Sequence, residues 1–367
     1  MRPLRGALVG HGFIGERGHM PAYASAAREG IPIEIVAVAD IRRPCLQRAL
    51  ATSPSLHVYD DYRDLLLRET SLDFVDIATP PYLHAAIAHA AFDRGLHVLC
   101  EKPIATSADD ASSMLAHAAR AKRVFFPSHN YKHAPVIQTV RSILDDDLIG
   151  DPHLVTLQTF RTTHARGVDD FLPDWRRVKR YAGGGIATDH GAHTFYLAFD
   201  WLGSYPTSIT AKMSMLDDSD TEDNLSCSMT FPTGLASAHL SWTAGDRKIL
   251  YTIHGAHGAV RVEDDDIEVA VMQKKKSGMV SWDRSHTSAP SDWMDASHVG
   301  WFTSLFRDFV RAIGAGDYVG REARDAEKCV ELIETAYASA QDGSREHSLG
   351  VSPRAVTRQY GAAASAH

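Results

Sequence analysis

The sequence predicts an α/β protein in two parts, an N-terminal doubly wound parallel sheet and a C-terminal α+β domain with a large open-faced, mainly antiparallel sheet. Three observations carry this prediction. The chain has 367 residues, more than one hydrophobic core usually holds. Apolar runs alternate with helical patterns up to about residue 127, and period-two alternation dominates after about residue 150. We expect one domain over residues 1–127 and a second over residues 128–367.

Short, nearly unbroken apolar runs mark the parallel strands, because strands of such a sheet are buried on both faces. The five expected strands are 5–9, 33–39, 74–78, 97–100 and 124–126. Helical patterns lie between them, including 83–94 and 108–120, and Ser107 is suited to be the N-cap of the second. Helical crossovers place such strands in one doubly wound sheet.

Turn signals such as Pro232-Thr233-Gly234 separate the strands expected in the second part. These strands are 153–160, 208–215, 225–231, 236–242, 249–254, 260–263 and 267–271. The polar stretch 273–298 is interpreted as an insertion or a lid-like loop. A last helix, at about 323–340, is expected to return toward the first domain.

Composition narrows the class of protein. The net charge of −8 disfavours nucleic acid as a partner, because phosphate binding needs a concentrated basic face. No run of 18 apolar residues is present, and glycines interrupt the apolar N-terminus, so we expect neither a membrane span nor a signal peptide. The four cysteines lie far apart, which fits a reducing, cytoplasmic setting.

A glycine-rich turn between the first strand and helix reads Gly10-His11-Gly12-Phe13-Ile14-Gly15, a GxGxxG pattern. Gly10 permits the tight turn, Gly12 lets a pyrophosphate approach the backbone, and Gly15 allows close helix packing. The second strand ends at Asp40, where a carboxylate can accept hydrogen bonds from a ribose. The pattern predicts a Rossmann domain that binds NAD. NADP stays open, because Arg42 and Arg43 follow and could hold a 2′-phosphate.

Three further motifs occur in order along the chain. They are Ala78-Thr79-Pro80-Pro81-Tyr82-Leu83-His84, Glu101-Lys102-Pro103 and the glycine-rich segment from Gly183 to His193. Together they resemble the ATPxxxH, EKP and GGG-x-x-x-D-x-G-x-H signatures of the Gfo/Idh/MocA oxidoreductases. The resemblance covers nearly the whole chain and implies hydride transfer between a nicotinamide and a sugar or polyol.

Oxidation of a secondary alcohol requires a base for the hydroxyl proton and a donor that stabilises the developing alkoxide. Lys102 follows a parallel strand at its carboxyl edge and fits the donor, and His193 fits the base. Asp189 lies four residues before His193, so on a helix both share one face, where Asp189 could fix the imidazole tautomer or bind a substrate hydroxyl.

Other interpretations of these residues stay open. Lys102 could be an ordinary surface lysine, and Asp189 and His193 could be a helix-terminal carboxylate and a packed histidine. Asp189, His190 and His193 could also be read as zinc ligands. Adjacent residues point apart on a helix and no further ligand is identifiable, so we expect no metal.

The resemblance implies further site residues. Glu101, Thr79 and Pro80 would line the nicotinamide end of the cofactor, where His84 either touches the ligand or caps the next helix. The expected substrate pocket adds Asn130, Tyr131, His164, Trp175 and Arg176. The open sheet face would join subunits in a homodimer or homotetramer.

The sequence therefore favours an NAD(P)-dependent dehydrogenase or reductase acting on a CH–OH group of a sugar, cyclitol or related polyol. Two alternatives remain: an NAD-dependent glycosidase that works by redox elimination, and a non-catalytic NAD(P)-binding regulator. The substrate, the hydroxyl, any phosphate or nucleotide handle and the physiological direction stay open.

Overall fold

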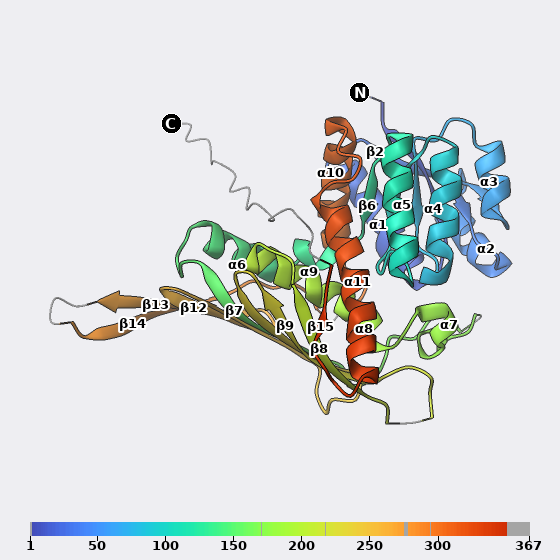
Figure 1. Ribbon diagram of the computed structural model, residues 1–367. Helices are drawn as coiled ribbons and strands as arrows, with labels where there is room; N and C mark the ends of the chain where they lie inside the picture. Colours follow the sequence, from blue (N-terminus) through green and yellow to red (C-terminus); the bar gives the residue numbers. More distant parts are fainter. Residues whose placement is uncertain (1, 170, 217, 275–277, 294, 351–367) are drawn as a thin grey trace, which may run out of the picture.

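The computed structural model describes residues 2–350 except 170, 217, 275–277 and 294. It contains a six-stranded sheet and a nine-stranded sheet, which lie on either side of a long helix, α11. Figure 1 shows the six-stranded part at the upper right and the nine-stranded sheet extending below and to the left.

The six-stranded sheet is parallel throughout, with the order β3-β2-β1-β4-β5-β6. Its strands are β1 Leu4–Val9, β2 Ile33–Ala39, β3 His57–Tyr59, β4 Phe74–Ile77, β5 His97–Cys100 and β6 Phe125–Pro127. The doubly wound sheet is as predicted, but the prediction of five strands was one short. The missed strand, β3, has three residues and an exposed His57, so it carries no apolar run. The order reverses between β1 and β4, where such sheets bind ligands.

Helices cover both faces of the parallel sheet. The helices of this part are α1 Met20–Arg28, α2 Arg43–Thr52, α3 Tyr62–Arg68, α4 His84–Asp93 and α5 Ala108–Ala121, with the π-helical turn η1 Gly15–His19 and the 3₁₀ turn η2 Pro81–Leu83. Ser107 accepts a hydrogen bond from the Asp110 amide and caps α5, as predicted. No described helix is long and apolar enough to cross a membrane.

Two C-terminal helices complete these layers, α10 Val299–Ala315 and α11 Arg321–Gln341. Phe302, Phe306 and Phe309 of α10 pack with α1, an arrangement that the sequence analysis did not predict. Ala323 and Ala326 of α11 join the core formed by α3, α4 and α5. The core around the parallel sheet therefore contains residues from both ends of the chain.

The nine-stranded sheet has the order β14-β13-β12-β11-β7-β10-β9-β8-β15, and β7 and β10 are its one parallel pair among the described strands. Its strands are β7 Pro152–Phe160, β8 Ser208–Ser214, β9 Asn224–Phe231, β10 Gly234–Ser241, β11 Lys248–Gly255, β12 Gly258–Glu263, β13 Asp266–Lys274, β14 Val280–Ser288 and β15 His347–Ser348. The remaining helical segments are η3 Asn130–His133, α6 Pro135–Asp145, η4 Trp175–Arg177, α7 Lys179–Ala182, α8 Ile186–Asp189 and α9 Gly191–Leu202.

The interpretation of 273–298 as an insertion or lid-like loop was wrong over Val280–Ser288, because this segment forms β14 and pairs with β13. Both sides of β14 face solvent. Its sequence therefore has no alternation of apolar and polar residues by which a strand could be predicted. Residues 275–277 and 294 of this stretch lie outside the described residues.

One face of the large sheet is covered and the other is open, as the sequence predicted. Helices α6 and α9 lie on the upper face in Figure 1, and no described helix lies on the lower face. Phe195, Phe199 and Trp201 of α9 are fully buried against inward-facing residues of the sheet, such as Leu157 and Tyr251.

A buried imidazolium lies between the parallel sheet and α10. His19 Nδ1 lies 2.7 Å from Asp76 Oδ2, and its Nε2 lies 3.1 Å from Glu101 Oε1. The Tyr23 hydroxyl donates to the same Asp76 oxygen at 2.8 Å. Burial by itself would lower the pKa of His19, but attraction and hydrogen bonds from the two carboxylates raise the pKa to about 10. Both ring nitrogens therefore donate, and the charged ring neutralises Asp76 and Glu101.

We predict that His19→Gln destabilises the fold by about 3–5 kcal/mol at pH 7, because removal of one partner leaves buried charge uncompensated. A histidine whose pKa is raised in the folded state stabilises the fold fully at pH values below the pKa it has in the unfolded chain. This stabilisation is lost as the pH rises to the folded-state pKa of about 10. The difference between wild type and variant in urea unfolding should therefore shrink between pH 7 and pH 10.

The control is His153→Gln, at an exposed position on β7. Equal unfolding midpoints for wild type and His19→Gln at pH 7 would contradict the prediction. If the variant does not fold, wild-type stability that stays constant between pH 7 and pH 10 contradicts it instead.

Candidate active site

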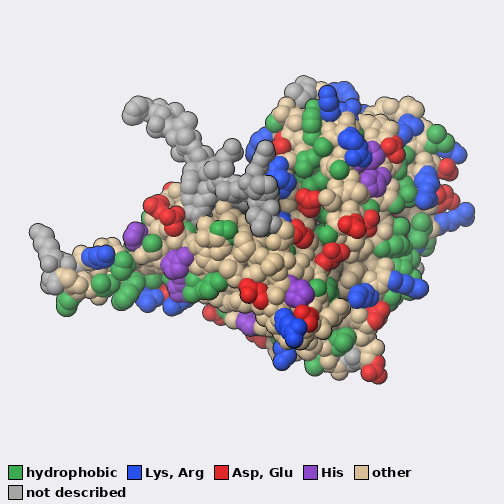
Figure 2. Space-filling view, viewed as in Figure 1, with side chains coloured by type: hydrophobic (Ala, Val, Ile, Leu, Met, Phe, Trp, Pro, Cys, Tyr) green, Lys and Arg blue, Asp and Glu red, His purple; other side chains and the backbone are tan. Residues whose placement is uncertain are grey.

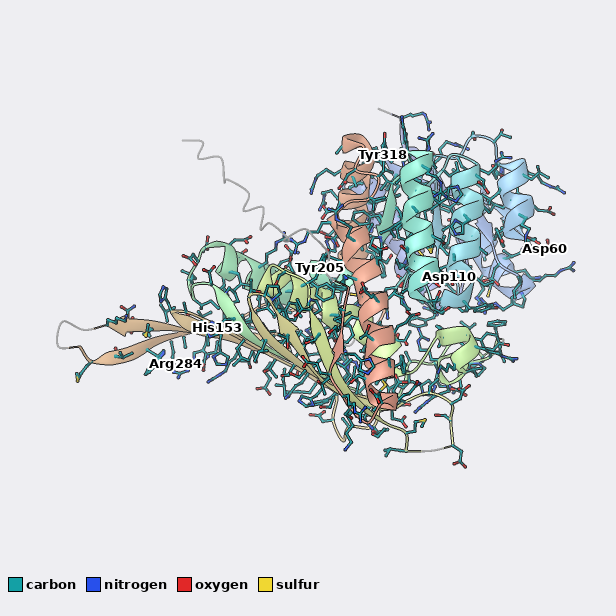
Figure 3. The ribbon with its side chains drawn as sticks, viewed as in Figure 1. Asp60, Asp110, His153, Tyr205, Arg284 and Tyr318 are labelled. Atoms are coloured by element: carbon teal, nitrogen blue, oxygen red, sulfur yellow. The ribbon has the colours of Figure 1, made fainter. Side chains whose placement is uncertain are left out.

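A cleft of about 630 Å³ lies at the carboxyl ends of the parallel strands. Its walls come from the turns after β1, β2, β4 and β5, and from η3, the segment 161–193 and the loop before α10. Asp60, labelled in Figure 3, marks the end of the cleft beside the parallel sheet. The cleft therefore joins the two sheets.

The glycine turn has the geometry that a bound dinucleotide requires. Gly10 has φ +98°, and a Cβ there would lie 2.6 Å from the Ala78 carbonyl oxygen. A Cβ on Gly15 would lie 2.4 Å from the Gly10 oxygen, so Gly15 allows the helix to approach the turn. At Gly12 a Cβ would meet only the Arg42 guanidinium, at 3.7 Å, and otherwise open space. Gly12, together with Phe13 and Ile14, lines the cleft, and a pyrophosphate fits beside its backbone.

Asp40 lies at the carboxyl end of β2 and lines the same cleft. Its Oδ2 accepts from the His11 amide at 2.8 Å, and Arg42 donates to it from Nη2 at 2.8 Å. Arg42 also lies over the Phe171 ring, 5.3 Å from its centroid. Arg43 is exposed on the first turn of α2 and is not among the residues that line the cleft.

Thr79 and Pro80 line the cleft, and the buried Thr79 hydroxyl has no hydrogen-bond partner among the described residues. An unpartnered polar atom in this position suits a ligand. His84 does not line the cleft. Its ring lies between the carbonyl oxygens of Thr79, at 2.8 Å, and Pro103, at 3.0 Å, and it is fully buried. His84 therefore joins the two turns that carry the site, and the prediction that it contacts cofactor is not supported by its position.

Lys102 and Asp189 form a partly buried ion pair across the cleft. Lys102 Nζ lies 2.9 Å from Asp189 Oδ1 and 2.9 Å from the Asp189 carbonyl oxygen. Arg176 Nε lies 3.6 Å from the same carboxylate oxygen, and His190 Nδ1 lies 3.3 Å from the other. Burial alone would raise the pKa of Asp189, but Lys102 and Arg176 lower it well below its usual range. Asp189 is therefore a carboxylate at neutral pH.

Asp189 does not orient His193. The helix after the triple glycine breaks at His190, so Asp189 ends α8 and His193 lies in the first turn of α9. The His193 ring stacks on Tyr131 with 3.9 Å between centroids, and its Nδ1 lies 3.1 Å from the Tyr196 hydroxyl. The suggestion that Asp189 fixes the tautomer was wrong, because Asp189 is occupied by Lys102.

His193 is neutral near pH 7. Burial and the neighbouring positive charge of Lys102 lower its pKa well below the usual range. Its Nε2 has no hydrogen-bond partner among the described residues, and the side chain lines the cleft. His190 also lines the cleft, and burial lowers its pKa to about 4.

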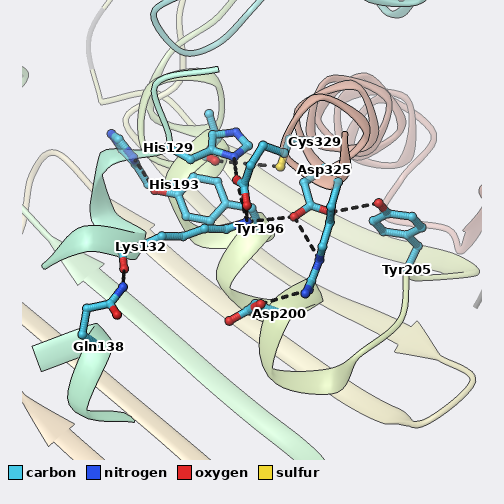
Figure 4. Close-up of polar contacts among 12 residues, drawn as sticks. His129, Lys132, Gln138, His193, Tyr196, Asp200, Tyr205, Asp325 and Cys329 are labelled. Carbon is cyan, nitrogen blue, oxygen red and sulfur yellow. Dashed lines mark hydrogen bonds and ion pairs between the residues drawn. The ribbon is translucent and has the colours of Figure 1, made fainter. Parts of the chain in front are cut away.

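A network of buried charges lies behind His193 (Figure 4). Lys132 Nζ contacts Glu322 at 2.8 Å and Asp325 at 2.9 Å, so it joins η3 to α11. His129 lies 3.3 Å from Glu322 and stacks on Tyr196 with 4.1 Å between centroids. Tyr196, the hydrogen-bond partner of His193, thus packs on His129, and His129 is bound to α11 through Glu322.

Most of the side chains that were expected to bind the substrate lie at the end of the cleft away from the glycine turn. Asn130 and Tyr131 line this end, as do Trp175 and Arg176. The buried Asn130 Oδ1 has no hydrogen-bond partner among the described residues. His164 does not line the cleft, because its Nε2 lies 2.9 Å from Asp174 and its ring lies against Trp242. The predicted substrate contact of His164 is therefore not supported.

Among the residues that line the cleft, sequence reasoning missed several polar and aromatic side chains, including Arg161, Arg247, Trp293 and His298. Arg161 directly follows a predicted strand, so its place at a sheet end was the available signal. The others come from loops that carry no motif. Among the described residues, no group of three or more histidine, cysteine or acidic side chains could hold a metal ion.

A parallel sheet with this order, a glycine turn open at Gly12, and a lysine with a buried histidine in one cleft define an NAD-binding oxidoreductase. The family model described as "Oxidoreductase family, NAD-binding Rossmann fold" matches residues 4–129, and the matching C-terminal domain model covers residues 137–261. The chain belongs to the Gfo/Idh/MocA oxidoreductase family, as the sequence motifs predicted.

Named relatives resemble the whole chain. A D-apiose dehydrogenase from Paraburkholderia graminis is 28% identical over 94% of this chain and 89% of its own length. An inositol 2-dehydrogenase from Rhizobium meliloti is 27% identical over 92% of this chain and 97% of its own length. The solved structure of a levoglucosan dehydrogenase in complex with NADH superposes with a TM-score of 0.82 at 21% identity, covering 95% of this chain and all of that one (100%), which shows a shared fold.

We predict that Gly12→Ala keeps the stability of the fold but weakens NADH binding about tenfold or more, because the methyl group projects into open space that the pyrophosphate needs. Fluorescence titration with NADH and urea unfolding measure the two effects. Gly314→Ala is the control, since a Cβ there meets nothing within 4 Å and lies in α10. Unchanged NADH affinity in Gly12→Ala would show that the dinucleotide does not bind at this turn.

Proposed function

We propose that the protein is a dehydrogenase or reductase that moves a hydride between a nicotinamide and a secondary alcohol or ketone carbon of a sugar, cyclitol or related polyol. The main support for the proposal is that Lys102, Asp189 and a neutral His193 line one cleft at the edge of a Rossmann sheet. The names of the relatives, which are dehydrogenases of apiose and inositol, support the same substrate class.

Lys102 is suited to stabilise the substrate oxygen. An ammonium group has three N–H donors, and two of those of Lys102 point to Asp189. The third is left for an alkoxide or carbonyl oxygen in the cleft. Asp189 holds the lysine in place, and Arg176 keeps this carboxylate ionised.

His193 is suited to exchange the hydroxyl proton through Nε2. This requires that Nδ1 carries a hydrogen and donates it to the Tyr196 oxygen, 3.1 Å away. Burial raises the pKa of Tyr196 well above its usual value, so its hydroxyl stays protonated. Because His193 is neutral near pH 7, it can accept a proton there. The bound cofactor supplies the hydride acceptor at nicotinamide C4.

We further propose that the cofactor is NAD in preference to NADP. The Asp40 carboxylate would repel a 2′-phosphate, and it accepts hydrogen bonds from the Arg42 backbone amide and guanidinium. Arg42 is therefore partly neutralised, and Arg43 lies outside the cleft lining.

We predict that Lys102→Met and His193→Asn each lower kcat on the best polyol about 10²–10⁴-fold, since each removes a group that acts on the reacting oxygen or its proton. A spectrophotometric screen at the nicotinamide wavelength with inositols, aldoses and their keto forms provides the assay. NADH affinity should change much less, because neither group lies at the glycine turn.

The control is His153→Gln, at an exposed position on β7 away from the cleft. Wild-type kcat in both site variants would refute the assigned roles. Release of aglycone from a nitrophenyl glycoside without net NADH would favour the redox-elimination glycosidase.

We propose that the chain forms a homodimer or homotetramer through the open face of the large sheet. The pairing register places Leu154, Leu235 and Trp282 on this face. Trp282 is 54% exposed on the β13–β14 hairpin, which projects from the rest of the molecule in Figure 1. Arg284, labelled in Figure 3, marks this hairpin, and Figure 2 shows hydrophobic side chains along it. An edge strand that exposes large apolar side chains such as Trp282 is typical of an interface.

We predict that Trp282→Glu shifts the protein from oligomer toward monomer, because a charge on the paired face must be desolvated on association. Size-exclusion chromatography with light scattering measures the mass. Leu67→Glu, at an exposed leucine of α3, is the control. A wild-type protein that is monomeric at micromolar concentration would end this part of the proposal.

A further inference from the structure

Arg161 and Arg247 lie side by side at the end of the cleft that faces the large sheet. Arg161 is the first residue after β7, and Arg247 is the last before β11. Phe160 and Lys248 form the final pair of these antiparallel strands, so the two arginines are the next residues beyond it. Both side chains line the cleft.

Neither arginine has a carboxylate partner among the described residues, whereas the other cations of the cleft do. The paired cations are Lys102 with Asp189 at 2.9 Å, Arg42 with Asp40 at 2.8 Å, Arg166 with Asp174 at 3.3 Å and Arg176 with Asp189 at 3.6 Å. Arg161 and Arg247 thus have no ion-pair partner among the described residues, and among carboxylates only the more distant Asp264 and Asp265 act on Arg247.

Both guanidinium groups keep free donors. Arg161 donates from Nη1 to the Phe160 carbonyl at 2.7 Å, and its Nη2 lies 3.5 Å from the Tyr131 hydroxyl. Arg247 donates from Nη2 to the Trp293 carbonyl. A guanidinium has five N–H donors, so most of those on each arginine remain for a ligand.

The nearest acids on the same side are occupied elsewhere. Asp264 pairs with Lys248 at 3.1 Å, and Asp265 accepts from the Ser291 amide at 3.0 Å. Like charges on neighbouring strands are destabilising unless an anion lies between them. Burial lowers the pKa of Arg247, and the proximity of Arg161 lowers it further.

The arginines adjoin the residues that would act on the substrate. Arg161 contacts Tyr131, and the Tyr131 ring stacks on His193. His298 also lines the cleft, with 6.3 Å between its ring centroid and that of Tyr131. Burial and the charges of Arg247 and Arg161 lower its pKa to about 4. A group bound by the arginines therefore belongs to the substrate and not to the adenosine half of the cofactor, which lies toward Asp40.

We propose that Arg161 and Arg247 bind an anionic group of the substrate, a carboxylate or a phosphate ester, so that the protein acts on an acidic sugar. Two guanidinium groups bind the oxygens of such a group with charge-assisted, paired hydrogen bonds. The inference rests on the proposed function, since it names the substrate class of the same site.

Calorimetric titration of the enzyme–NADH complex tests the inference without any turnover. The probes share one carbon skeleton: D-gluconate and D-glucuronate carry a carboxylate, D-glucose 6-phosphate carries a phosphate ester, and D-glucose is neutral. We expect an acidic probe to bind at least about tenfold more tightly than D-glucose. Preference for a carboxylate or for the phosphate ester identifies the anionic group.

The variant is the double substitution Arg161→Gln and Arg247→Gln, which keeps a polar side chain but removes both charges and the guanidinium groups. We expect it to weaken binding of the acidic probe about ten- to hundredfold, to raise KM for an acidic substrate with little change in kcat, and to leave D-glucose affinity unchanged. Arg141→Gln, at an exposed position on α6, is the control for the loss of positive charge.

Equal affinity for D-glucose and all acidic probes would overturn the inference, and so would full retention of acidic-probe affinity in the double variant. Failure of the proposed function has another signature, which is tight NADH binding with no turnover of any polyol, acidic or neutral. The binding titration gives its answer in either case, so the two failures are distinguishable.

Discussion

The ion pair between Lys102 and Asp189 is the contact on which the site depends. Lys102 comes from the turn after a strand of the parallel sheet, and Asp189 ends a short helix, α8, that packs against the other sheet. Neither charge can be left alone in a buried cleft, because an unpaired buried charge costs several kcal/mol. Each part of the molecule thus supplies the counter-charge of the other, and their relative position is fixed where the substrate must lie.

Each side of this pair has a second layer of charge behind it. On the parallel-sheet side, the His19 imidazolium holds Glu101, the residue before Lys102. On the other side, Lys132 and Glu322 fix His129, on which Tyr196 packs (Figure 4). Groups that act on a substrate need rotamers that are set before the substrate binds. The buried networks provide this, and α11 takes part because it carries Glu322.

Parts of this arrangement could be predicted from the sequence, for a physical reason. Buried parallel strands must be apolar, and a dinucleotide turn must contain glycine, so both leave a signal in the residues themselves. The strand β14 leaves none, since both of its faces meet solvent. His84 belongs to a motif, but the motif does not show which way its side chain points. Only the fold shows that the ring lies between two backbone carbonyls. Arg161 and Arg247 are 86 residues apart, and only the antiparallel register of β7 and β11 brings them together.

The charge of the cleft is divided between its two ends. Carboxylates of Asp40 and Asp60 line the end beside the parallel sheet, where hydroxyl groups of a ribose can donate to them. Guanidinium groups without an ion-pair partner among the described residues line the other end, at β7 and β11. The ribose hydroxyls of a dinucleotide would face the carboxylates, and the anionic group of an acidic polyol would face the guanidinium groups. A reversed orientation of either molecule would place an anionic group against the carboxylates. Because like-charge contacts at a binding site cost several kcal/mol, this division would favour the proposed acidic substrate and a single orientation of it.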